Sequence, residues 1–210
     1  MNIIFSHETA LQICGQLKIH GNDEALSQRS SRDYRATYAA CSDETYEEKL
    51  QFLKKEYGIV LAKTTHEILR NNSRTRFSEM RVSHQFKCLL PVGSLIELGQ
   101  NVYCVLPALA VCMMSRNKSP LHQIVLANLI MASYGHLANG ELYEFDVPLV
   151  TSTELTSLLN ALEPYSPGLH TTKKNMRYFF SDAVSPMEVK MAIRSAMPYC
   201  EGGFNQIPLA

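Results

Sequence analysis

Two strongly apolar segments, residues 107–115 and 120–134, constrain the fold of this chain more than any other feature. Each opens with a proline, which is favoured at the first position of a helix, where an N–H group has no intrahelical partner. In the second segment, apolar side chains cover most of the helical circumference, as is typical of a helix buried on all sides. Ser119 is a suitable N-cap and Gly135 a suitable end. We therefore expect a buried helix near the centre of the molecule.

Capping signals predict further helices on both sides of this apolar centre. Ser6 can cap a helix that ends at Gly15, and residues 42–58 begin with a serine cap and end with a glycine stop. In that second helix, acidic residues crowd the first turn and lysines the last, which complements the helix dipole. Thr151 and Glu154 have capping-box spacing, so another helix should start there.

Segments rich in β-branched and aromatic residues favour strands between these helices. They are GIVLAKT from residue 58, RVSHQFKCLL from residue 81 and LIELGQNVYCVL from residue 95. The predicted fold class is therefore α+β, with a small mixed or antiparallel sheet packed against an apolar helical bundle. The polar stretch EPYSPGLHTTKKN interrupts the apolar pattern, so a domain boundary is expected within residues 163–183.

Charge and cysteine content limit the partners and the compartment that we expect. Twenty basic residues balance twenty acidic ones, so overall charge does not draw the chain to nucleic acid or membranes. The N-terminus does not resemble a signal peptide, and the longest apolar run is too short to span a bilayer. We therefore expect a cytoplasmic protein with no membrane partner. The six cysteines form no CxxC pair, which favours buried free thiols over disulfides or a metal site.

No local motif predicts a metal, cofactor or nucleotide site. The histidines form no HxxxH or HxH pair and have no cysteine at ligand spacing, so we expect no metal site. The chain also has no glycine-rich phosphate loop and no G-x-S-x-G elbow, which leaves nucleotide hydrolysis and serine-hydrolase chemistry unsupported. The seven histidines are His7, His20, His66, His84, His122, His136 and His170.

Two groups of basic residues are candidates for contact with nucleic acid. Spaced cations neutralise phosphates, which supplies the sequence-independent part of such binding. The alternative is an ordinary solvated surface, because no helix-turn-helix or aromatic-interleaved pattern accompanies the charges. The candidate residues are Arg70, Arg74, Arg76 and Arg81 in the first group, and Lys173, Lys174 and Arg177 in the second.

The segment SPMEVKMAI, from Ser185 to Ile193, predicts a helix with an unusual glutamate. Ser185 can cap the helix, Pro186 suits the first position and Glu188 the third, so these residues satisfy the capping-box pattern. On a helical wheel, however, Glu188 lies between the apolar arc and the basic face. This position is compatible with either a capping role or a functional role.

Five motifs, taken in order, carry a family resemblance: IFSHETAL, LPVGSLIELGQNVYCV, the Pro-initiated apolar helix after it, SPMEVKMAI and PYCEGGF. Together they resemble a bacterial family that joins an abortive-infection-antitoxin-like N-terminal region to an endonuclease-like domain of the very-short-patch-repair type. The resemblance implies that residues 1–163 form the antitoxin-like α+β region. It implies that residues 164–210 form a linker and the first helix of a truncated, incomplete endonuclease-like domain, with Glu188 in the family's acidic metal site.

Such a nuclease also needs further acidic residues on later strands to hold one or two Mg²⁺ or Mn²⁺ ions. Only 22 residues follow Glu188, and none is an aspartate. We therefore expect a non-catalytic, truncated or minimal homologue that acts as a binding or regulatory module. Its expected partner is DNA, another protein or a second copy of the chain. The alternative is a DNA endonuclease fragment that is active only with its missing C-terminal part or as an oligomer.

Overall fold

The computed structural model describes residues 2–31, 43–61, 66–70, 77–78, 81–86, 88–136, 142–144, 146–180, 186–201 and 203–204. The helices are α1 (His7–Ile19), α2 (Asp23–Ser27), α3 (Asp43–Tyr57), α4 (Pro107–Met114), α5 (Pro120–Met131), α6 (Ser152–Ala161), α7 (Leu169–Asn175) and α8 (Pro186–Ala196), with 3-10 turns η1 (Met176–Tyr178) and η2 (Tyr199–Glu201). The strands are β1 (Ile3–Phe5), β2 (His66–Arg70), β3 (Phe77–Ser78), β4 (Arg81–Gln85), β5 (Leu95–Gly99), β6 (Val102–Val105), β7 (Tyr134–His136) and β8 (Leu142–Glu144).

Six strands form one mixed sheet in the order β3-β4-β2-β1-β6-β5, which confirms the predicted α+β class. β1 lies inside this sheet, parallel to β6 and antiparallel to β2, with Phe5 opposite Ile68. β2 in turn runs parallel to β4. Strands β7 and β8 form a separate antiparallel pair. The short β1 therefore joins the two halves of the sheet, although its sequence alone did not indicate a strand.

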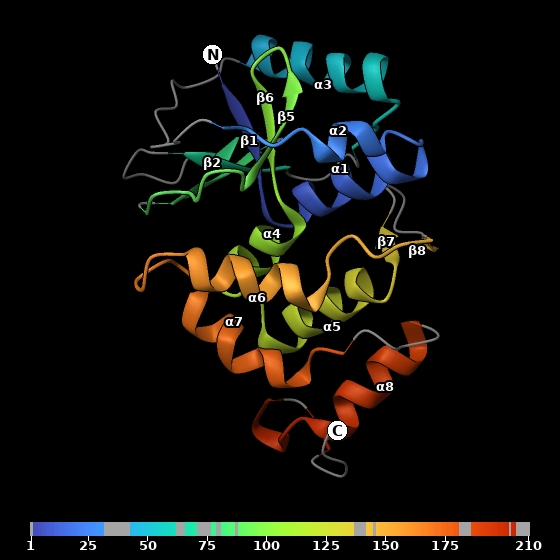
Figure 1. The fold of residues 1–210 in the computed structure, drawn as a ribbon, viewed down its shortest axis with the longest axis vertical. Coiled ribbons are helices and arrows are strands. Elements are labelled where there is room, and N and C mark those ends of the chain that lie inside the picture. The colour runs from blue at the N-terminus through green and yellow to red at the C-terminus, as the bar shows by residue number, and fades with distance from the viewer. Residues whose placement is uncertain are drawn as a thin grey trace.

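The apolar helices lie where the sequence predicts, between the sheet and the C-terminal helices (Figure 1). All eight residues of α4 are buried. Helix α5 begins at Pro120, and the Ser119 hydroxyl accepts a hydrogen bond from the backbone N–H of His122 at 3.2 Å. The predicted end of this helix is wrong, however: it stops at Met131, and Tyr134 begins β7.

Two further predicted helix boundaries are confirmed. Helix α3 ends at Tyr57, and Gly58 follows with a φ of 71°, the left-handed conformation that glycine adopts without strain. At the start of α6, the Thr151 backbone N–H donates to the Glu154 carboxylate at 2.8 Å. The Glu154 N–H donates back to the Thr151 hydroxyl at 3.2 Å, which completes the capping box.

Two predicted features near the N-terminus are wrong, for a shared reason. Helix α1 continues through Gly15 to Ile19, and residues 58–61 form no strand; residues 62–64 of that predicted strand lie outside the described residues. The Gln16 side chain accepts from the Val60 N–H at 2.8 Å and donates to its carbonyl at 2.9 Å. This tertiary pairing holds the last turns of α1 and satisfies backbone groups that a neighbouring strand would otherwise bind.

Helix α8 starts at Pro186, as predicted, and lies at the end of the molecule farthest from the sheet (Figure 1). It packs against α5 through Val189 and Ile193, and these two residues and Met197, which directly follows the helix, are fully buried. Its predicted cap, Ser185, lies outside the described residues. The proposed boundary between residues 163 and 164 stays a prediction. Among the described helices, none is both long and apolar enough to cross a membrane.

Candidate functional site

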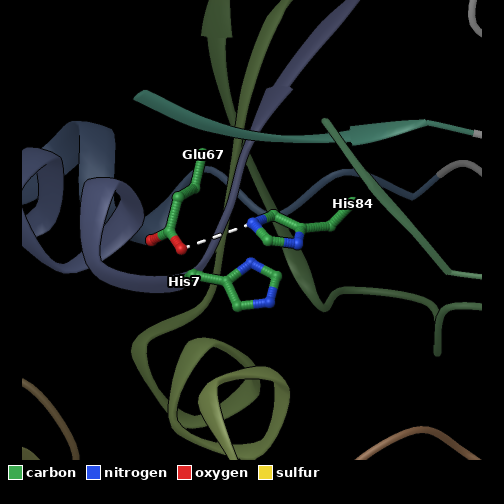
Figure 2. A group of neighbouring side chains, drawn as sticks. All are labelled: His7, Glu67 and His84. Atoms are coloured by element: carbon green, nitrogen blue, oxygen red, sulfur yellow. Dashed lines mark ion pairs between the residues drawn. The ribbon is translucent and has the colours of Figure 1, made fainter. Parts of the chain in front are cut away.

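Three side chains from distant parts of the chain, His7, Glu67 and His84, converge below the sheet (Figure 2). Each offers one atom that can bind a metal ion, and these atoms all lie within 4.8 Å of one another. The side chains are largely shielded from solvent: His7 is 3 % exposed, and the Glu67 and His84 side chains are 12 % and 17 % exposed. Within the described part of the chain, this is the one such group of three or more potential ligands.

The register of the sheet explains why Glu67 and His84 meet. In the parallel pair β2 and β4, Glu67 lies opposite Val82, and Leu69 lies opposite His84. Side chains alternate between the two faces of a strand, so all four residues lie on the same face. Glu67 and His84 are therefore diagonal neighbours on adjacent strands, a position from which long side chains can reach each other.

His7 reaches the same place because the chain turns sharply where β1 ends and α1 begins. Its backbone φ is 51°, in the left-handed region that residues other than glycine seldom occupy. Backbone bonds to β2 hold this junction: the Ser6 N–H donates to the Glu67 carbonyl, and the Glu67 N–H donates to the Thr9 hydroxyl, both at 2.9 Å. Strain of this kind costs about 1–3 kcal/mol and occurs preferentially at functional sites.

The two oxygens of the Glu67 carboxylate have different partners. Oε2 accepts a hydrogen bond from the Glu8 backbone N–H at 2.9 Å, and Oε1 lies 3.3 Å from His84 Nε2. That nitrogen is buried, and no described residue forms a hydrogen bond with it: Glu67 lies within ion-pair distance, but the geometry is not that of a hydrogen bond. Burial by itself raises the pKa of Glu67. The neighbouring His84, electrostatic interactions with His7 and Lys118 and the Glu8 N–H together outweigh this effect, so the net pKa is lowered.

Burial keeps His7 neutral. It lowers the pKa of this histidine to about 3, and the nearby imidazole of His84 acts in the same direction. The carboxylate of Glu67 raises the pKa but does not compensate. A neutral imidazole has a free lone pair on one ring nitrogen, which is the form in which histidine binds metals.

Asn117, in the turn after α4, links the two rings on the side away from Glu67. Its Nδ2 lies 3.3 Å from His7 Nε2 and 3.0 Å from His84 Nδ1. The remaining nitrogen of His7, Nδ1, lies 2.9 Å from the Ser6 hydroxyl. The ring centroids are 4.0 Å apart. Each imidazole is thus fixed through one nitrogen by Asn117, and the other nitrogen lies on the Glu67 side.

A cavity of about 160 Å³ adjoins the two histidines. Arg116 and Asn117, both exposed, line it at the surface, so the cavity opens to solvent there. Its other walls are Leu69, Phe86, Met113 and Pro167. Solvent therefore has access to the cluster from one side.

The candidate residues named from the sequence lie elsewhere. Glu188 is exposed in the first turn of α8, and among the described residues it belongs to no group of potential metal ligands. The first basic group falls on β2, β4 and the chain between them: Arg70 and Arg81 are strand residues, whereas Arg74 and Arg76 lie outside the described residues.

The second basic group is exposed on the C-terminal side of the molecule. Lys173 and Lys174 lie on α7, and Arg177 lies on η1, with its guanidinium 4.7 Å from the centre of the Tyr178 ring. Figure 1 places α7 well away from β2.

The prediction of buried free thiols is confirmed for Cys14, Cys104 and Cys112. Burial raises the pKa of Cys112 to about 11, so this thiol is not activated. Cys88 is half-buried and Cys200 exposed, and both are free.

Sequence reasoning missed the cluster because it searched for ligands at short spacing. The one local signal was the two-residue spacing of side chains along a strand. Glu67 is two positions from Leu69 and Val82 is two from His84, so each pair would lie on one face of its strand. Compared with known proteins, the chain matches no family model, no curated protein and no solved structure significantly.

Proposed function

We propose that this chain is a binding module built around a divalent metal ion held by His7, Glu67 and His84. The observation that carries the proposal is the convergence of two imidazoles and one carboxylate, shielded from solvent beside a cavity. Two histidines and one carboxylate form the ligand set of several zinc and non-haem iron sites, in which a further coordination position stays open.

The distances suit such an ion after a small inward movement. In a tetrahedral zinc site with bonds of about 2.0–2.2 Å, ligand atoms lie about 3.3–3.6 Å apart. His84 Nε2 and Glu67 Oε1 are already 3.3 Å apart, and the three ligand atoms lie within 4.8 Å of one another. A cation between them would also provide the buried His84 Nε2 with a partner.

Asn117 fits the role of a positioning residue for both ligands. Metal-binding histidines usually donate a hydrogen bond from their second ring nitrogen, which fixes the tautomer and the ring orientation. A half-turn of the Asn117 amide exchanges its nitrogen for its oxygen, which would accept protons from His7 Nε2 and His84 Nδ1. His84 Nε2 would then present a lone pair to the ion, and His7 Nδ1 would do so in place of its contact with the Ser6 hydroxyl.

Calorimetric titration of metal-free protein with Zn²⁺ tests this proposal. We expect one ion per chain, with binding weakened at least about tenfold by His84→Ala and by Glu67→Gln, since each removes one of three ligands. The matched control is His170→Ala, because His170 is an exposed histidine on α7 outside the cluster. Equal affinity in His84→Ala and His170→Ala would overturn the proposal.

Nucleic-acid binding is a second candidate function, supported by the exposure of Lys173, Lys174 and Arg177 within five consecutive residues. DNA binding agrees with the sequence resemblance to antitoxin-like and endonuclease-like proteins. In this case, we propose that the chain acts as a regulator rather than as a nuclease. A gel-shift titration with duplex DNA tests it. Salt-sensitive binding that weakens in a Lys173→Glu, Lys174→Glu double variant supports it, and unchanged mobility at low salt contradicts it.

A further inference from the structure

We propose that a second cavity, at the start of α4, binds a small monocarboxylic acid with an apolar body. This cavity has a volume of about 360 Å³, at the lower end of the range for small-molecule sites. Pro107 and Ala108, the first residues of α4, line it, whereas Asn117 and the metal cluster lie at the other end of that helix. The inference therefore does not depend on the proposed metal site.

The first turn of α4 has two backbone N–H groups without an acceptor. Its N-cap is Leu106, whose side chain has no oxygen to accept a hydrogen bond, and Pro107 has no N–H. Ala108 and Leu109 follow and are buried, and the N–H of neither residue bonds to any part of the chain that the structure describes. Buried backbone groups are nearly always paired, and the start of a helix favours an anion. Because Ala108 lines the cavity, a ligand there can supply the missing acceptor.

Ser94 is an independent sign of a missing ligand. It is 1 % exposed, and its hydroxyl has no hydrogen-bond partner among the described residues. The Leu106 N–H donates to the Ser94 carbonyl at 3.0 Å, which extends the antiparallel pairing of β5 and β6 by one residue. Their side chains therefore lie on the same face, and both residues line the cavity. An unpaired buried hydroxyl costs about 1–3 kcal/mol, and a carboxylate oxygen would accept its hydrogen bond.

Arg29 supplies a positive charge at the same cavity. Its backbone pairs with Ile96 of β5, and its exposed side chain forms no ion pair or hydrogen bond with another described residue. Glu154 also lines the cavity, but its Oε2 already accepts hydrogen bonds from the backbone N–H and the hydroxyl of Thr151. One guanidinium and the positive end of the α4 dipole, against one carboxylate, suit a single negative charge better than a doubly charged phosphate.

The remaining walls are apolar and determine the body of the ligand. Leu149, Val150 and Leu158 line the cavity, and Val92, which is 65 % exposed, lies at its rim. A hydrocarbon chain or ring against these side chains would gain about 25 cal/mol for each Å² of apolar surface removed from water. An inorganic anion would leave the same walls uncovered. The walls and the donors together therefore favour a carboxylate that carries a hydrocarbon group.

Amide chemical shifts of ¹⁵N-labelled protein test this inference. Octanoate should shift the Ala108 and Leu109 signals downfield in a saturable way, because their N–H groups gain an acceptor. Octan-1-ol has the same chain length without the negative charge, and it should bind at least about tenfold more weakly, the loss expected for hydrogen bonds to a charged group. Inorganic phosphate, which has no apolar body, should give no saturable shift over the same concentrations.

Two substitutions identify the donors. Arg29→Gln should weaken octanoate binding about tenfold, and Ser94→Ala about threefold, because the first removes a charged donor and the second a neutral one. The matched control is Arg194→Gln, which removes an exposed arginine of α8 and should bind as the wild type does. Octanoate that leaves the Ala108 and Leu109 signals unchanged would overturn the inference. So would octan-1-ol or phosphate that binds as tightly as octanoate, or equal affinity in Arg29→Gln and Arg194→Gln.

Discussion

At the scale of single residues, His7 has the most unusual environment in the cluster. It combines a positive φ, nearly complete burial and a pKa lowered to about 3. Each of these features opposes stability, since strain costs free energy and a buried imidazole cannot gain a proton easily. Their coincidence at a residue that faces Glu67 and His84 is the residue-scale argument that the position serves binding.

The lowered pKa of His7 predicts how stability changes with pH in metal-free protein. Below pH 6.5 the unfolded chain protonates His7, whereas the folded protein does not until the pH approaches 3. The free energy of unfolding should therefore fall as the pH falls, by up to about 1.4 kcal/mol per pH unit from this group. Glu67 contributes little above pH 5, because its carboxyl is largely ionised there in the unfolded chain, where the pKa is 4.5, and the folded state lowers that pKa further.

Urea denaturation at pH 7.5 and pH 5, with a chelator present, measures this effect. Between pH 7.5 and pH 5, the free energy of unfolding should fall by about 2 kcal/mol less in His7→Gln than in the wild type. His170→Gln should retain the wild-type difference, because that side chain is exposed. If the free energy of unfolding falls by the same amount in His7→Gln and in the wild type, the fold does not keep His7 neutral.

At the scale of elements, helix caps and the strands β4, β5 and β6 were readable from the sequence, whereas the pairing of the strands was not. Ser119, Thr151 and Glu154 make the bonds that their spacing predicts, because caps involve residues close in sequence. By contrast, β1 has three residues and pairs with β6, nearly one hundred positions later along the chain. The register of β2 and β4 brings Glu67 to His84, and no local pattern specifies that register.

Gly168 gives a prediction at the junction of two helices. It precedes α7 with a φ of 87°, and a Cβ added there would overlap the Cys112 carbonyl oxygen and lie 2.5 Å from the Ser115 hydroxyl oxygen. Gly21 has a similar φ of 70° but open space around it. Gly168→Ala should therefore lower the free energy of unfolding by about 2 kcal/mol more than Gly21→Ala.

Chemical denaturation of the two variants, compared with the wild type, measures this difference. Gly21→Ala isolates the cost of backbone strain, which is about 1–2 kcal/mol for a left-handed residue. Equal losses in the two variants would mean that α7 moves away from the end of α4 without penalty, contrary to the close packing described above.

At the scale of the whole molecule, one apolar core extends from the sheet into α4, α5, α6 and α7. A polar network lies within it: Gln123 donates to the Val111 carbonyl and the Thr172 hydroxyl, both at 2.9 Å, and accepts from Asn175 at 2.7 Å. This side chain is fully buried and joins α5 to α4 and α7. Buried networks of this kind specify one arrangement of helices when every member is satisfied.

Gln123→Met keeps the side-chain volume and removes all three hydrogen bonds. We expect the free energy of unfolding to fall by about 2–4 kcal/mol, because the polar groups of Thr172 and Asn175 lose their partner while buried. Leu126→Met, at another buried position of α5, is the control and should cost less than about 1.5 kcal/mol. Equal effects of the two substitutions in a denaturant titration would argue against a structural role for the network.

The central claim is that folding assembles a metal site from His7, at the start of α1, and from Glu67 and His84 on two neighbouring strands. Anomalous diffraction at the zinc edge, from crystals of Zn²⁺-loaded protein, tests this claim most directly. We predict one zinc peak about 2.0–2.2 Å from one nitrogen each of His7 and His84 and from a Glu67 oxygen. Zinc bound at cysteines or surface carboxylates, with no peak between these three side chains, would contradict it.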